Sequence, residues 1–288
     1  MPWPTFRFAP SPNGALHLGH AYSALFTDAA ARKAEGWFLL RLEDIDVVRC
    51  TDALVRDCLF DLGWLGLSWE EPVRRQSAHM ADYQAALRRL DAMGLLYPCT
   101  CSRQDILRAA GPDAPRDPDG TPLYPGTCKG RRESERKAVI GGGAGYALRL
   151  DLEKAMPFGP SLWFEEDGEG PDGEKGRIEA VPLRWGDVVL ARKDIGTSYH
   201  IAVVTDDALQ GITHVTRGQD LFHATGLHRL LQALLNLPEP RYHHHRLIGD
   251  ETGRKLSKSE GAPSLRSLRE QGLTPATIRR ELGFIALP

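Results

Sequence analysis

Two short motifs with basic side chains stand near opposite ends of this chain of 288 residues. His17-Leu18-Gly19-His20 follows a turn rich in Pro and Gly, and Lys255-Leu256-Ser257-Lys258 lies between Gly253 and Gly261. The imidazoles could donate hydrogen bonds to phosphoryl oxygens, and Gly19 leaves room for a flat base or ribose. The lysines are point cations that can follow a moving phosphate. Alone, each motif also fits a helix cap or a solvated loop, but the pair favours nucleotidyl transfer.

The segments around these motifs predict alternating strands and helices. The predicted elements are a strand at 5–9, a helix at 17–35, a strand at 38–44, a helix closed by Gly94 at 79–94, further α/β patterns at 199–237, and helices at about 264–283. Such alternation indicates a parallel α/β sheet. The first strand-to-helix turn would then lie at the carboxyl edge of the sheet, where ligands bind.

Residues 97–189 have the composition of a loop-rich insertion and contain Cys99, Cys101 and Cys128. Thiolates are good zinc ligands, and a tetrahedral structural site needs four groups. From spacing alone, zinc and three unconnected cysteines are equal alternatives, because C-x-C is tighter than the usual C-x2-C. A zinc ion here would be structural, since the insert has little core of its own.

Composition limits the classes of function. Hydrophobic residues make up 42% of the chain, and its net charge is -2, so a nucleic-acid contact would need a local basic patch. Residues 129–137 (KGRRESERK) are such a patch, although a solvated loop or helix face is the usual interpretation. No segment has the roughly 20 apolar residues of a membrane span. We therefore expect a cytoplasmic protein, without a membrane partner and monomeric.

Several segments resemble the class I aminoacyl-tRNA synthetases, within them the glutamyl and glutaminyl branch. These segments are FAPSPNGALHLGH at 8–20, RLEDID at 41–46, YHIAVVTDDALQGITHVTRGQDL at 199–221 and GRKLSKS at 253–259. The resemblance implies a Rossmann catalytic domain split by a zinc-containing insert. In that family the signature residues, here His17, His20, Lys255 and Lys258 with Gly19 beside them, bind ATP and stabilise the adenylation transition state, and magnesium is the expected companion of ATP.

The expected division is a catalytic domain at 1–96 and 190–250, the insert at 97–189, and the lysine loop with a helical tail at 251–288.

A glutamate pocket is also implied by this resemblance. A glutamate substrate needs arginines for its two carboxylates and a carboxylate for its ammonium group. Arg7 and Arg217 are expected to hold the carboxylates and Glu43 the ammonium. Ser11 and Tyr199 should fix the orientation of the substrate. The full expected pocket comprises Arg7, Phe8, Ala9, Pro10, Ser11, Glu43, Tyr199 and Arg217. Glutamine stays open as a substrate, because one changed pocket residue could alter the choice.

For the insert, the short relatives of glutamyl-tRNA synthetase carry a zinc ion whose fourth ligand is a tyrosine. Tyr124 matches that position, beside Cys99, Cys101 and Cys128. Asp119 and His79 stay open as alternatives for the fourth ligand.

Only 29 residues follow Ser259, so we expect no anticodon-reading domain of the kind that longer relatives carry. The resemblance to short members of the family implies activation of L-glutamate with ATP, without tRNA, and transfer to the queuosine base in the anticodon of tRNA(Asp). A truncated glutamyl-tRNA synthetase that charges a tRNA 3' end is the alternative. A nucleotidylyltransferase of another pathway would not need the arginine and glutamate set. A non-catalytic paralogue would usually lose the motifs that are intact here.

Overall fold

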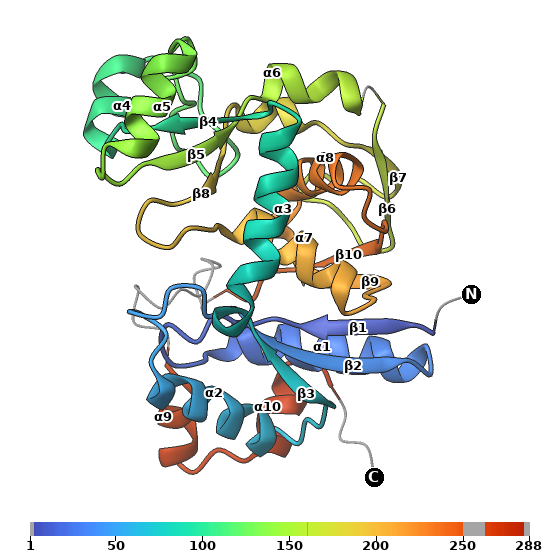
Figure 1. Ribbon diagram of the computed structural model, residues 1–288. Coiled ribbons are helices and arrows are strands. Elements are labelled where there is room, and N and C mark those ends of the chain that lie inside the picture. The colour runs from blue at the N-terminus through green and yellow to red at the C-terminus, as the bar shows by residue number, and fades with distance from the viewer. Residues whose placement is uncertain (1–2, 160, 250–262, 285–288) are drawn as a thin grey trace.

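The computed structural model describes residues 3–159, 161–249 and 263–284 of the chain. Its centre is a sheet with the strand order β3-β2-β1-β9-β10-β6-β7 (Figure 1). The strands are β1 (Thr5–Phe8), β2 (Trp37–Leu42), β3 (Glu70–Arg75), β6 (Trp163–Glu166), β7 (Gly176–Glu179), β9 (His214–Gly218) and β10 (Arg241–His245). All neighbours pair in parallel except β6 and β7, which pair antiparallel. The expected parallel α/β sheet is confirmed.

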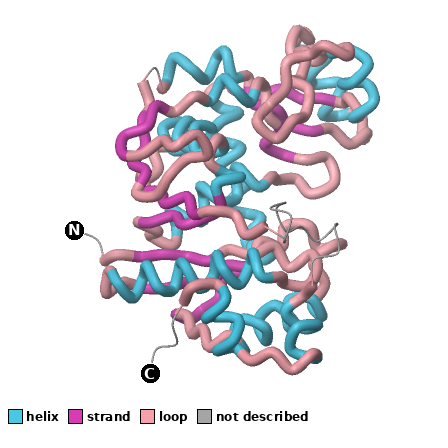
Figure 2. Tube along the Cα trace, turned by 180° about the vertical axis from the view of Figure 1, so that it is seen from behind, coloured by secondary structure: helices cyan, strands magenta, loops and turns pink. Residues whose placement is uncertain are grey.

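Helices pack in two groups on the sheet. One group is α1 (Leu18–Lys33), α2 (Asp52–Trp64), α9 (Leu265–Glu270) and α10 (Pro275–Glu281). Its apolar side chains form one core with Phe6, Phe8 and Leu40 of the sheet. The other group is α3 (Met80–Ala92), α7 (Tyr199–Leu209) and α8 (Ala224–Leu234), which form a second core. Figure 2, seen from behind, shows α1 lying along the strands.

A smaller antiparallel sheet lies apart from the main one (Figure 1). Its strands are β4 (Leu96–Cys99), β5 (Ala147–Leu150) and β8 (Val189–Ala191), and helices α4 (Arg103–Ala110), α5 (Glu133–Gly141) and α6 (Leu152–Ala155) lie between β4 and β8 in the chain. Within 97–189, β6 and β7 nevertheless pair with the main sheet. Short strands therefore occur within this loop-rich region, and a strand of four residues leaves too short a pattern to recognise in the sequence. The division into 1–96 with 190–250, 97–189 and 251–288 stays a prediction.

The elements expected near the two ends of the sequence are confirmed. A strand occurs within 5–9, another at 37–42 overlaps the expected 38–44, helices occur within 17–35 and 79–94, and two helices occur within 264–283. The histidines at 243–245 end β10. In the described part of the chain, no helix is long and apolar enough to cross a membrane.

Candidate active site and candidate zinc site

A cleft of about 650 Å³ opens at the carboxyl edge of the main sheet. It lies where β1 and β9 are neighbours in the sheet. The chain continues from β1 to β2 on one side of this point and from β9 to β10 on the other, so the two connections run in opposite directions. Parallel α/β sheets bind their ligands at such a switch point. The lining includes the whole expected pocket and three residues of the first motif, namely Arg7, Phe8, Ala9, Pro10, Ser11, His17, Gly19, His20, Glu43, Tyr199 and Arg217. The structure thus brings together residues more than 200 positions apart.

The first motif both caps helix α1 and lines the cleft. The backbone N–H of Gly19 donates to His17 Nδ1 over 3.1 Å, and the N–H of His17 donates to His20 Nδ1 over 3.2 Å. Each neutral ring therefore carries its proton on Nε2. A Cβ atom at Gly19 would lie 3.0 Å from His17 Cε1, so glycine permits the close approach of this ring. The capping and ligand-binding interpretations are therefore compatible.

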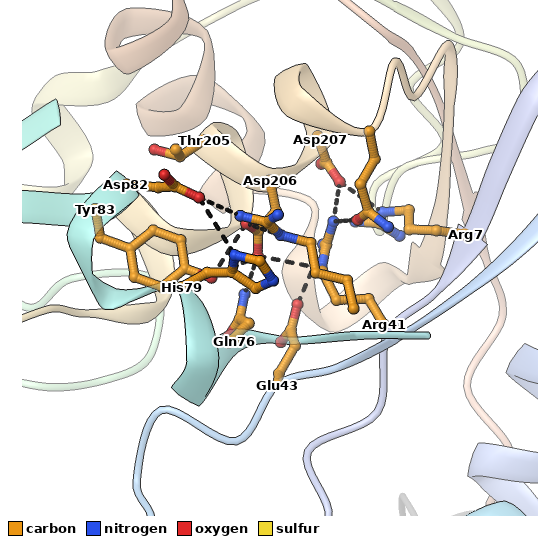
Figure 3. Close-up of polar contacts among 12 residues, drawn as sticks. Arg7, Arg41, Glu43, Gln76, His79, Asp82, Tyr83, Thr205, Asp206 and Asp207 are labelled. Atoms are coloured by element: carbon orange, nitrogen blue, oxygen red, sulfur yellow. Dashed lines mark hydrogen bonds and ion pairs between the residues drawn. The ribbon is translucent and has the colours of Figure 1, made fainter. Parts of the chain in front are cut away.

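Arg7, which lines the cleft, and Arg41 converge on one carboxylate oxygen (Figure 3). Asp207 Oδ1 accepts from Arg7 Nε at 2.9 Å and from Arg41 Nη1 at 2.7 Å. Arg41 also forms an ion pair with Glu43, with 3.3 Å between Nη2 and Oε1. Burial alone would raise the pKa of Asp207, but the two guanidinium groups lower it below the ordinary value. Arg7 and Glu43 are thus held by residues that the sequence analysis did not single out.

Asp206, next along α7, is fully buried and anchors this network to the neighbouring elements (Figure 3). Its carboxylate accepts from Arg74 Nε at 2.7 Å, from Gln76 Nε2 at 2.8 Å and from the Tyr83 hydroxyl at 2.9 Å. A pair of acids in an otherwise apolar helix, IAVVTDDAL, was the available signal for such a buried charge cluster.

Glu43 lies at the end of β2 and faces the cleft rather than open solvent. Its side chain is 11% exposed, so the carboxylate is largely shielded from solvent. Burial raises the pKa of Glu43, and Arg41 and Arg7 oppose that rise. The Ser11 hydroxyl donates to the backbone oxygen of Glu43 over 2.9 Å, which joins the loop after β1 to the end of β2.

Arg217 on β9 is 5% exposed and lines the same cleft. In the described part of the chain it forms no ion pair with an acidic side chain. Its N–H groups instead donate to neutral acceptors, which are His244 Nε2 at 3.1 Å, His228 Nδ1 at 3.1 Å, Thr225 Oγ1 at 2.6 Å and Tyr199 Oη at 3.4 Å. A buried guanidinium without a carboxylate is costly unless an anion completes the site.

Lys255 and Lys258 lie outside the described residues. The described residues on either side of that segment are close to the cleft. Ile248 lines it, and Ser264 forms an antiparallel bridge with His17. Ser264 therefore lies beside the first motif, and Ile248 lies at the same cleft.

A second site gathers three cysteines and a tyrosine between β4 and α5. The thiol sulfurs of Cys99, Cys101 and Cys128 lie within 4.8 Å of one another. Tyr124 Oη is 3.4 Å from Cys99 Sγ and 3.6 Å from Cys101 Sγ, and the sulfurs of Cys101 and Cys128 are 3.6 Å apart. Four ligands at tetrahedral zinc distances would have edges of about 3.8 Å between sulfurs and about 3.5 Å from sulfur to oxygen. The four side chains fit zinc.

The alternatives for the fourth ligand are not supported. No His, Asp or Glu joins the cysteine cluster among the described residues. His79 contacts Asp82 beside α3, 3.6 Å from its carboxylate. Burial raises the pKa of Cys101 to about 11, so a metal ion binding here would have to displace a proton from this thiol. The zinc would supply no chemistry to the cleft and would hold the insert together.

Comparison with known proteins identifies the family. The family described as "tRNA synthetases class I (E and Q), catalytic domain" matches residues 5–286. A protein of Rhodobacter capsulatus named "Glutamyl-Q tRNA(Asp) synthetase" is 48% identical over 96% of this chain and 99% of its own length. A protein of the same name from Symbiobacterium thermophilum is 38% identical, over 97% of this chain and 85% of its own length. "Glutamate--tRNA ligase 2" of Nitrosococcus oceani is 38% identical over 94% of this chain but 57% of its own.

Solved structures agree on the fold. The glutamate tRNA ligase of Elizabethkingia meningosepticum, solved in complex with its amino acid, superposes with a TM-score of 0.76 at 24% identity. The match covers 97% of this chain, which spans 60% of the length of that structure. A glutamate-tRNA synthetase of Elizabethkingia anophelis superposes with a TM-score of 0.78. With the family match over nearly the whole sequence, the chain belongs to the class I tRNA synthetases of the glutamyl and glutaminyl branch and is a ligase of the aminoacyl-tRNA synthetase type.

Proposed function

We propose that this enzyme activates L-glutamate with ATP, without needing tRNA, and transfers the glutamyl group to the queuosine base in the anticodon of tRNA(Asp). The observation that carries the proposal is the buried Arg217, which lines the cleft and lacks an acidic partner among the described residues. The names of the relatives from Rhodobacter capsulatus and Symbiobacterium thermophilum support the choice of tRNA. Because ATP and tRNA are present in the cytoplasm, we propose a cytoplasmic enzyme, and we propose separately that it acts as a monomer.

The cleft supplies the groups that the first step needs. Arg7 and Arg217 hold the two carboxylates of glutamate, and Glu43 holds its ammonium group. The α-carboxylate then attacks the α-phosphate of ATP, and pyrophosphate leaves. His17 and His20 lie at the start of α1, where Nε2–H groups and the helix amino terminus stabilise negative charge on the phosphates. Magnesium would accompany ATP and neutralise charge on its phosphates.

The second motif completes this proposal from the sequence alone. We assign Lys255 and Lys258 to the phosphates of ATP, where a lysine can follow the charge that moves to the leaving pyrophosphate.

Charge favours glutamate over glutamine. A glutamine side chain would bring an uncharged amide and leave one buried guanidinium without an anion. The affinity for glutamine should therefore be at least several-fold lower than that for glutamate. Because Arg7 is already paired with Asp207 and Arg217 has no acidic partner among the described residues, we assign the decisive carboxylate contact to Arg217.

The first test is pyrophosphate exchange with ATP and either glutamate or glutamine, in the absence of tRNA. Exchange that depends on glutamate supports the activation step, and exchange only with glutamine or only with tRNA present contradicts it. The second test offers labelled glutamate with tRNA(Asp) that carries queuosine, tRNA(Asp) that lacks it, and tRNA(Glu). Label on the first alone is the expected result.

One relative favours a second candidate, a glutamyl-tRNA synthetase that charges the 3' end of a tRNA. The Nitrosococcus oceani protein named "Glutamate--tRNA ligase 2" matches 94% of this chain. Nuclease digestion of the labelled tRNA distinguishes the two activities. Label in the anticodon fragment supports the proposal, whereas label on the terminal nucleotide supports charging.

A further inference from the structure

Two histidines from different elements accept hydrogen bonds from the same buried arginine. Arg217 Nε lies 3.1 Å from Nε2 of His244 on β10, and Arg217 Nη1 lies 3.1 Å from Nδ1 of His228 on α8. Both imidazoles are nearly inaccessible to solvent. Thr225 Oγ1 accepts from Arg217 Nη2 at 2.6 Å and lies 3.3 Å from the same nitrogen of His244. The guanidinium is therefore held on three of its nitrogens.

The protonation of both rings follows from these contacts. A guanidinium can only donate, so Nε2 of His244 and Nδ1 of His228 must be unprotonated acceptors. The remaining protons then sit on His244 Nδ1, which faces Glu166 Oε2, and on His228 Nε2, which lies 3.2 Å from His200 Nδ1. Burial and the nearby Arg217 lower the pKa of His228 well below its ordinary value. Both rings are neutral at physiological pH.

A neutral acceptor and a carboxylate would affect the charge of Arg217 differently. A carboxylate at either position would orient Arg217 but would also neutralise it, and it would compete with an incoming anion for the guanidinium. An imidazole fixes the direction of the N–H groups and leaves the positive charge available. Arg7 shows the contrast, because its Nε is paired with Asp207 at 2.9 Å.

We propose that His228 and His244 are positioning residues that aim Arg217 at a substrate carboxylate without cancelling its charge. The inference deepens the proposed function and rests on it, since the carboxylate in question is that of glutamate. Glu166 acts on Arg217 through the His244 ring. Its Oε1 accepts from the backbone N–H groups of His244 and Gly168 at 2.8 Å each, which holds Oε2 against His244 Nδ1, and this second contact fixes the tautomer of the ring.

The test compares His228→Asn with His228→Asp. The two side chains have nearly the same shape and both place an oxygen near the Nδ1 position, but only the second carries a negative charge. We expect H228N to keep most of the affinity for glutamate and H228D to bind glutamate at least about tenfold more weakly, by calorimetric titration of the whole protein with glutamate. The KM for ATP in pyrophosphate exchange should change little in both.

A matched control is His214→Asp at the other end of β9, where the ring stacks on Phe6 and does not line the cleft. We expect it to leave glutamate binding unchanged. At His244, Gln keeps an acceptor near Nε2 and Leu removes it, so H244Q should bind glutamate more tightly than H244L. Thermal unfolding of each variant establishes that it is folded, and the His244 pair provides the comparison if H228D does not fold.

The outcomes separate the two proposals. If the wild type binds no glutamate, the proposed function falls, and the inference falls with it. If the wild type binds glutamate while H228N and H228D lose affinity equally, or H244Q and H244L do so, the histidines have only a packing role and this inference alone is overturned.

Discussion

Asp207 on α7 holds Arg7 on β1 across 200 positions of sequence, with 2.9 Å between Oδ1 and Nε. Both side chains are almost completely buried. The same oxygen accepts from Arg41, so one carboxylate orients two guanidinium groups beneath the cleft. The sheet strand that carries Arg7 and the helix that carries Asp207 are thereby fixed to each other at the place where substrate is proposed to bind.

Replacing Asp207 by Asn should weaken both stability and glutamate binding. The amide keeps the shape of the carboxylate but leaves two buried cations with less compensation, which should cost about 3 kcal/mol of unfolding free energy. Arg7 would also be less well oriented, so the KM for glutamate should rise about tenfold. Urea unfolding and pyrophosphate exchange measure the two effects.

Asp82→Asn is the control for this change. Asp82 pairs with Arg74 in the same network but is 39% exposed, so its loss should alter stability by less than about 1 kcal/mol. Equal effects of the two substitutions would contradict the special role of Asp207.

The pH dependence of glutamate binding should follow the ionisation of the Glu43 carboxylate. Its carboxylate must be ionised to bind the ammonium group, and burial raises its pKa above the ordinary 4.5. Affinity is therefore expected to be complete at neutral pH and to fall, as the pH decreases, at a higher pH than an ordinary glutamate would give. The measurement is 1/KM for glutamate against pH.

Glu43→Gln should raise the KM at neutral pH by at least about tenfold and remove this acid limb. Any limb that survives in E43Q belongs to the substrate's own carboxylates. Glu70→Gln, at an exposed position of β3, is the matched control and should leave the profile unchanged. An unaltered profile in E43Q would remove Glu43 from the ammonium site.

The zinc site predicts one zinc per chain, measured by elemental analysis of protein purified without added metal. Tyr124→Phe removes only the hydroxyl that lies 3.4 Å from Cys99 Sγ, and it should weaken zinc affinity at least about tenfold in competition with a chelator. Cys99→Ser should lose zinc and thermal stability together.

Tyr97→Phe is the control for the tyrosine. Tyr97 is also buried, but its hydroxyl donates to Asp187 rather than approaching the sulfurs, so zinc affinity should be retained. A wild-type protein without zinc would end the hypothesis for the whole site.

Lys258→Ala should lower the rate of glutamate-dependent pyrophosphate exchange about 10²-fold, because it removes a positive charge proposed to stabilise the transition state. Lys175→Ala, whose ammonium group pairs with Glu169 on the surface, should retain normal exchange. Near-normal exchange in K258A would contradict the role assigned to the second motif.

Much of this molecule could be predicted from local patterns. The helix after residue 17 begins with His17 accepting from the Gly19 backbone, and such a cap depends on residues two positions apart. The strands at 5–9 and 38–44 follow from apolar runs that end in turn or acidic residues. Cys99, Cys101, Tyr124 and Cys128 lie within 30 positions, so one short segment contains the whole candidate zinc site, although spacing alone left zinc and unconnected cysteines as equal alternatives. By contrast, β6 pairs through few residues with a strand almost 80 positions later, and nothing in its own sequence reveals that partner.

The sequence by itself indicated the parallel sheet and, through the order of its motifs, a resemblance to a family and the pocket residues that this resemblance implies, because hydrophobic period and motifs are properties of short segments. Only the tertiary structure decided which partners compensate the charges of these residues and orient their side chains. Arg7 forms an ion pair with Asp207, and Glu43 forms one with Arg41. Arg217 instead donates hydrogen bonds to two neutral imidazoles. Those partners come from separate strands and helices, and whether a buried charge is compensated depends on distances in space that no single segment contains.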